Sequence, residues 1–106
     1  MIQCTCIVQA GQISEASQAA LSGKIDAFAQ KAFGAGAEIN WISVPQGGGF
    51  TASKPSTSSI VSLRAPAPVD QAERAPLLHE LCGFWTAETG QSLNEVVGVI
   101  SDPVAS

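Results

Sequence analysis

The chain begins with the stretch IQCTCIVQ at residues 2–9. Apolar and polar side chains alternate there, so that Ile2, Cys4, Cys6 and Val8 share one face. This period of two is typical of a β-strand with one buried face. The chain has three cysteines, an odd number without the spacing of a zinc site, and we therefore expect Cys4 and Cys6 to be core residues.

A helix and a second strand follow the first strand. Ser14 is a suitable N-cap, apolar residues recur at helical spacing from Leu21 to Ala32, and Gly34 is suited to end the helix. We expect the second strand at about residues 38–44. The Gly-, Ser- and Pro-rich stretch 45–57 then predicts a mobile loop or a wide hairpin.

The second half repeats this order. A strand is expected at about residues 58–65, a helix with a capping box formed by Asp70 and Glu73, and a last strand at about residues 95–101. Pro76 indicates either a kink or a later start of this helix. The two halves match at a constant offset of 57, which predicts two β-α-β units in tandem that match from first strand to last without an insertion or deletion. The pairs that match are Leu21 with Leu78, Ile25 with Cys82, Phe28 with Trp85, and Ile39 with Val96.

Each unit should form a parallel strand pair with a right-handed crossover helix. Two such units joined by a hairpin predict a two-layer α+β fold, a four-stranded mixed sheet with both helices on one face. We expect a single domain over residues 1–106, with units at about 1–45 and 58–103 and a connection at 46–57. The other face of the sheet would remain uncovered; it is called the open face below.

Only 13% of the residues are charged, about half the usual share. This scarcity and the open face favour an oligomer, although an uncharged surface rich in Ser, Ala and Gly is the alternative. The net charge of −4 leaves no basic surface for nucleic acid or an anionic membrane. No apolar run is long enough for a membrane span and the start lacks a secretion signal, which predicts a cytoplasmic protein. No motif indicates a metal or cofactor.

The layout resembles the tautomerase superfamily, and most nearly its cis-3-chloroacrylic acid dehalogenase branch. The resemblance rests on Val8-Gln9, Ile25-Asp26-Ala27, the strand at 42–46, Ile60-Val61-Ser62-Leu63-Arg64 and the closing stretch 97–103. It implies a homotrimer, and an isomerase or lyase whose base is an N-terminal proline. Burial lowers the pKa of such an amine, because it disfavours the charged form.

Ile2 occupies the position of that proline, so the resemblance implies absent, weak or atypical activity. A large second residue should leave Met1 in place, and the terminal amine of Met1 then becomes the candidate for proton transfer or Schiff-base chemistry. Arg64 matches a family arginine that binds a substrate carboxylate, through two parallel hydrogen bonds. An ion pair between subunits is the alternative for Arg64. Trp41 and Phe50 flank the Gly-rich stretch and are candidates to line a pocket, or to pack in the core or an interface.

Other family features are missing. The branch's second arginine falls within Pro66-Ala67-Pro68, its first-helix histidine near Ala29 and its last-strand tyrosine near Val99. Three hypotheses remain open. The chain is a tautomerase-like homotrimer that binds a small carboxylate or keto acid, a non-catalytic oligomeric binding or assembly protein of that fold, or a dimeric ferredoxin-like α/β barrel for a small apolar ligand.

Overall fold

The computed structural model describes residues 1–45, 50–51, 54–55 and 58–103. The glycines predicted to form a loop, residues 47–49, lie outside the described residues. A short hairpin connects the two halves of the chain. The elements in chain order are β1 (Ile2–Gln9), α1 (Glu15–Phe33), β2 (Ala37–Val44), β3 (Phe50–Thr51), β4 (Lys54–Pro55), β5 (Ser59–Arg64), α2 (Gln71–Thr89), a 3-10 turn (Leu93–Glu95) and β6 (Val96–Ser101).

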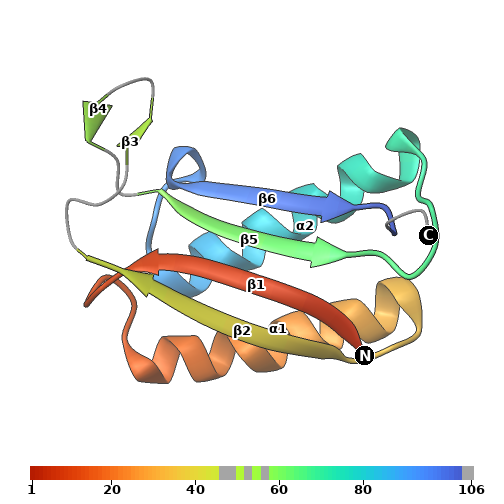
Figure 1. Cartoon of the computed structure of the whole chain (residues 1–106), viewed down its shortest axis with the longest axis horizontal. Helices are drawn as coiled ribbons and strands as arrows, with labels where there is room; N and C mark the ends of the chain where they lie inside the picture. Colours follow the sequence, from red (N-terminus) through yellow and green to blue (C-terminus); the bar gives the residue numbers. More distant parts are fainter. Residues whose placement is uncertain (46–49, 52–53, 56–57, 104–106) are drawn as a thin grey trace.

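The main sheet has the strand order β2-β1-β5-β6. β1 is parallel to β2 and antiparallel to β5, and β5 is parallel to β6. Both helices lie on one face of this sheet (Figure 1), which confirms the predicted two-layer fold. In a ferredoxin-like sheet the two strands of a β-α-β unit are split by another strand. Here they are neighbours, so the strand order does not fit the ferredoxin-like alternative.

Local capping sets the ends of both helices. The side chain of Ser14 accepts a hydrogen bond from the Ser17 N–H, and that of Asp70 accepts one from the Glu73 N–H. Each helix ends at a glycine with positive φ, which an L side chain adopts only at a cost. The later start of the second helix, predicted from Pro76, is wrong. The helix begins at Gln71, because Asp70 caps its first turn and Pro76 removes a single N–H donor near the N-terminus.

The number of residues that separates corresponding positions of the two β-α-β units varies along the structure, so the predicted constant offset of 57 is wrong. Their first strands begin 57 residues apart, but both helix caps are 56 apart and the last strands begin 59 apart. The extra residues of the second unit lie around the 3-10 turn before β6. At an offset of 56, Phe28 corresponds to Phe84, and these two rings meet edge to face with centroids 5.8 Å apart.

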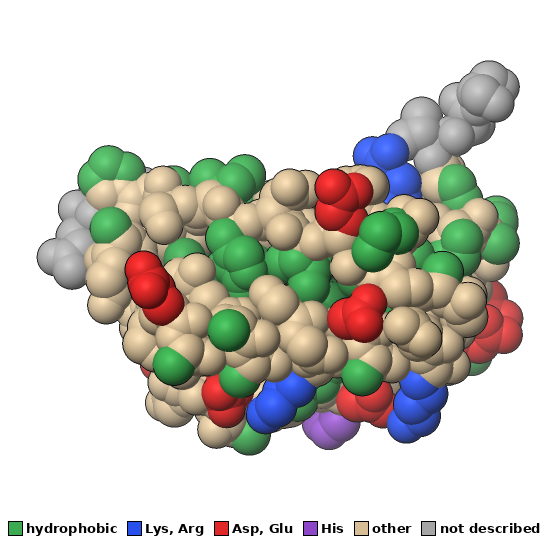
Figure 2. Space-filling model, turned by 90° about the horizontal axis from the view of Figure 1, so that it is seen from below, with side chains coloured by type: hydrophobic (Ala, Val, Ile, Leu, Met, Phe, Trp, Pro, Cys, Tyr) green, Lys and Arg blue, Asp and Glu red, His purple; other side chains and the backbone are tan. Residues whose placement is uncertain are grey.

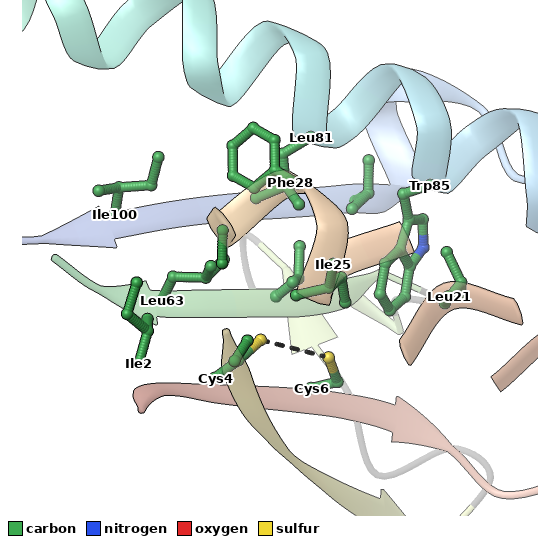
Figure 3. Close-up of a cluster of buried hydrophobic side chains, with 14 of the residues drawn as sticks. Ile2, Cys4, Cys6, Leu21, Ile25, Phe28, Leu63, Leu81, Trp85 and Ile100 are labelled. Atoms are coloured by element: carbon green, nitrogen blue, oxygen red, sulfur yellow. Dashed lines mark hydrogen bonds between the residues drawn. The ribbon is translucent and has the colours of Figure 1, made fainter. Parts of the chain in front are cut away.

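The core lies between the sheet and the helices (Figure 3). The predicted inward face of β1 is confirmed, since Cys4 and Cys6 are fully buried and their sulfurs are 3.9 Å apart. Trp85 closes one end of the core and donates its indole N–H to Gln91 Oε1 at 2.8 Å. The largest fully buried hydrophobic side chains are Trp85, Leu21, Ile25, Leu63, Leu81, Val8 and Val61.

Candidate functional site

The open face of the sheet consists of three rows of side chains that run across all four strands. Strand register defines these rows, because residues of one parity point to the same face. The rows, in the order β2, β1, β5 and β6, are Ile42–Ile7–Ile60–Val97, Asn40–Thr5–Ser62–Val99 and Glu38–Gln3–Arg64–Ser101. Gln3 is opposite Arg64 because it lies one residue beyond the Cys4–Leu63 pair. The face is therefore apolar at one end and polar at the other.

At the polar end the face is hollowed around Arg64. The hollow has a volume of about 220 Å³ and is lined by Gln3, Thr5, Ser62, Arg64 and Ser101. Three hydroxyls and an amide thus surround one guanidinium. Gln3 is also tied to the neighbouring strand, since its Nε2 donates to Glu38 Oε2 at 2.9 Å. A guanidinium among hydroxyls can bind a carboxylate through charge-assisted hydrogen bonds.

The apolar end of the face leaves large side chains in contact with solvent. Ile42 and Val97 are each 46% exposed and Ile60 is 37% exposed, although all three lie on strands of the main sheet. On the side of the molecule drawn in Figure 2, charged side chains are scattered and apolar surface lies between them. A contiguous apolar row on a sheet is typical of a contact surface. This apolar row, which contains Ile60, lies four residues along the strands from the polar row that contains Arg64. The two rows are therefore about 13 Å apart.

The N-terminus lies at the same end of the sheet as Arg64 (Figure 1). The Ile2 side chain is 4% exposed and packs in the core, and its backbone N–H donates to the Gly36 carbonyl at 2.8 Å. With Met1 in place this nitrogen belongs to a peptide bond, and a peptide nitrogen is not the base that a terminal proline supplies. Met1 is 80% exposed and precedes β1. Its amine is close to the polar end, but Met1 is not one of the residues that line the hollow.

The structure does not bring Trp41 and Phe50 to Arg64. Trp41 lies on the helix side of β2, where its ring stacks on Trp85 with centroids 5.9 Å apart. Its indole N–H donates to Ser22 Oγ at 3.0 Å. Phe50 pairs with Pro55 in the β3–β4 hairpin, which lies at the other end of the sheet from the tip of β5 (Figure 1).

In the part of the chain that the structure describes, other reactive groups do not form a second site. The hydrogen bond with Cys4 and burial both raise the pKa of the Cys6 thiol, and burial raises the pKa of Cys82, so these two remain protonated and unreactive near neutral pH. Among the described residues there is no group of three or more side chains suited to hold a metal. Within the same ranges no helix has the length and hydropathy needed to cross a membrane.

Two further hollows of about 260 Å³ lie on the helix side. One lies between the helices around Phe28 and Phe84, where Lys31 is paired with Glu80 and Lys24 with Glu88. The other lies beside the Pro66–Pro68 turn. Neither contains an arginine or a group of hydroxyls comparable to the polar end of the open face.

Sequence reasoning placed Gln3, Thr5 and Ser62 on the same face as Arg64 but did not find Glu38 or Ser101. Both join the site through parallel pairing, Glu38 opposite Gln3 and Ser101 opposite Arg64. The signal available in the sequence was the alternation of side chains within β2 and β6. This alternation indicates which face of the sheet a residue occupies, but it does not indicate the residue opposite it on the neighbouring strand, because strand register depends on tertiary packing.

No family model matches the sequence, and no curated protein matches it. Similar structures are known. Native Ps01740 superposes with a TM-score of 0.88 and 25% identity, over 97% of this chain and 95% of that chain. The protein N1, described as a member of the cis-3-chloroacrylic acid dehalogenase family, gives 0.87 and 11% identity, over 95% and 74%. A wild-type symmetric trimer of fused 4-OT gives 0.83 and 16% identity, over 95% and 85%.

These likenesses extend over nearly the whole of this chain and include both β-α-β units. The chain therefore has the tautomerase fold. This agrees with the fold that the sequence resemblance implied.

Proposed function

We propose that this protein is a tautomerase-superfamily member, a single domain over residues 1–106, that binds a small carboxylate or keto acid at Arg64. Support comes from the polar end of the open face, where one guanidinium lies among three hydroxyls and the Gln3 amide. No other hollow described above combines a cation with this number of hydrogen-bonding groups. The observation that carries the proposal is the position of Arg64 in this hollow.

The protein is also proposed to be a homotrimer in the cytoplasm. The apolar row of the open face supplies a contact surface, and three subunits can bury it around a common axis. The fused 4-OT structures, which have this fold, are trimers. Because the apolar and polar rows lie at opposite ends of the strands, assembly through the first leaves the second available to a ligand.

Isomerase or lyase activity is proposed to be absent, weak or atypical. The reason is the state of Ile2, whose nitrogen is a hydrogen-bonded peptide N–H and whose side chain belongs to the core. The exposed Met1 amine, at the same end of the sheet, is the candidate for proton transfer that takes the place of the proline. A purely binding or assembly role is the second candidate, and the same state of Ile2 favours it.

Calorimetric titration with propionate and pyruvate tests the carboxylate site. A charge-assisted contact contributes roughly 1.5–3 kcal/mol, so Arg64→Ala should weaken binding about ten- to hundredfold. Arg64→Lys should lose much of the same binding affinity, since an ammonium cannot reproduce two parallel hydrogen bonds. Lys31→Ala removes a cation from the helix face and is the matched control, with unchanged affinity expected.

Two results would contradict the proposal. One is unchanged affinity in Arg64→Ala. The other is an oligomer that dissociates in Arg64→Ala while no carboxylate binds the wild type at millimolar concentration, which would make Arg64 an interface residue.

A further inference from the structure

The orientation of the Gln3 amide is fixed by its partner on β2. Gln3 Nε2 lies 2.9 Å from Glu38 Oε2. An ionised carboxylate only accepts hydrogen bonds, so the NH₂ end of the amide must be the end that faces Glu38. The parallel register supports this contact, because Gln3 and Glu38 are direct partners in the ladder between β1 and β2.

This orientation decides which atom Gln3 offers to the hollow. The amide is planar, so when its nitrogen faces β2 its carbonyl oxygen points away from β2. Gln3 lines the hollow together with Arg64, and the two lie opposite each other on neighbouring strands. Adjacent strands are about 4.8 Å apart. The acceptor Gln3 Oε1 is therefore the amide atom left to face the hollow that Gln3 lines together with Arg64.

We propose that the Arg64 site selects 2-hydroxy acids over 2-oxo acids. A carboxylate held by Arg64 places the group on its adjacent carbon within reach of Gln3 Oε1. A hydroxyl at that carbon donates to this oxygen, whereas a ketone brings a second acceptor against it. Gln3 is thus a specificity-determining residue and Glu38 is the residue that orients it. This inference rests on the proposed carboxylate site and narrows its ligand class.

The ligand series L-lactate, pyruvate and propionate tests this selection by calorimetry on the intact protein. Lactate and pyruvate differ only at the carbon next to the carboxylate, and propionate has neither oxygen there. A neutral hydrogen bond corresponds to about a two- to tenfold difference in affinity. Wild-type protein should bind lactate tighter than the other two by about this factor.

Two variants separate the preference from the carboxylate contact. Gln3→Met keeps the length of the side chain without polar amide atoms, and should bind all three acids with equal affinity. Glu38→Gln replaces a group that only accepts by an amide that both donates and accepts, so either end of the Gln3 amide can then face β2 and the preference should fall. Asn40→Ala, which alters β2 outside the hollow, should retain it.

The outcomes distinguish this inference from the proposed function. If all three acids bind the wild type equally and binding is lost in Arg64→Ala, the carboxylate site stands and the selection of 2-hydroxy acids is refuted. A preference that persists in Gln3→Met also refutes it. If no acid binds, both the carboxylate site and the selection fail.

Discussion

Replacing Ile60 by glutamate should dissociate the proposed trimer without unfolding the subunit. Ile60 is at the centre of the apolar row, on β5, and 37% of it is exposed in the monomer. Complete burial of such a side chain is worth roughly 1.5–3 kcal/mol, so assembly can gain about a third of that from each subunit, or about 0.5–1 kcal/mol.

Ile60→Glu loses this gain and adds an unpaired carboxylate to the interface, at a cost of at least about 1–3 kcal/mol. The sum is about 1.5–4 kcal/mol per subunit, or about 4.5–12 kcal/mol for the trimer. Since about 1.4 kcal/mol is a factor of ten, even the lower value changes the assembly constant by about three orders of magnitude. Repulsion between three carboxylates near one axis adds to this.

Sedimentation at micromolar concentration gives the result. Wild-type protein should have three times the 10.8 kDa of the monomer, and Ile60→Glu should have the monomer mass. Circular dichroism shows whether the variant remains folded. Ala19→Glu places the same charge on the exposed side of α1 and should leave the trimer intact. A wild-type monomer, or a folded Ile60→Glu trimer, would refute the assignment of this row to assembly.

Three further predictions concern the fold and the N-terminus. The Val69 N–H and the Arg74 guanidinium hold the pKa of Asp102 below its ordinary value, so this carboxylate contributes stability above the pKa of about 3.9 of an unfolded aspartate, and the contribution is lost as pH falls through the folded-state pKa. Denaturation should therefore show Asp102→Asn less stable than wild type at pH 7 and close to it at pH 2, and a constant difference would contradict this. A Cβ on Gly36 would lie 2.7 Å from Asp26 Oδ1, which accepts the Ala37 N–H, so Gly36→Ala should destabilise the protein by about 1–3 kcal/mol. Gly23→Ala in α1 meets no atom within 4 Å and should instead stabilise by about 0.5–1 kcal/mol, and equal effects of the two in urea would refute the steric argument. Ile2→Pro, even when mass spectrometry confirms loss of Met1, should turn over phenylenolpyruvate far below a typical rate of about 10 s⁻¹, because the proline supplies a base while the second arginine, the histidine and the tyrosine of the branch that the chain resembles stay absent. Turnover near that rate, about 10 s⁻¹, would show that the site is already sufficient for catalysis.

The parts of the fold that depend on local chemistry were predictable. Ser14 and Asp70 cap the helices by accepting a hydrogen bond from a backbone N–H of the first turn. Gly34 and Gly90 end the helices by adopting the left-handed backbone conformation. Alternation in β1 and β5 gave the correct buried faces. The errors concern spacing between elements. The constant offset missed the 3-10 turn before β6. The later helix start, which Pro76 indicated as the alternative to a kink, is wrong because the Asp70 cap fixes the start at Gln71.

The polar hollow was only half predictable for a related reason. The position of Arg64 at the end of its strand, and its face, followed from alternation. The neighbours Glu38 and Ser101 depend on the register of two parallel pairs whose strands are separated by whole helices. Trp41 looked available for a pocket, yet stacking on Trp85 places it on the opposite side of the sheet.

The internal repeat has a consequence for how the two ends of the open face differ. At the strand offset of 57, Gln3 corresponds to Ile60 and Ile7 to Arg64. If the protein instead assembled from separate, identical β-α-β units, each pair of corresponding positions would carry the same side chain. A substitution that improved ligand binding at one end of the open face would then also change the contact surface at the other end. Joining the units in one chain lets each position mutate alone. In this chain the corresponding positions carry different residues, so the two units supply a polar surface at one end of the open face and an apolar surface at the other.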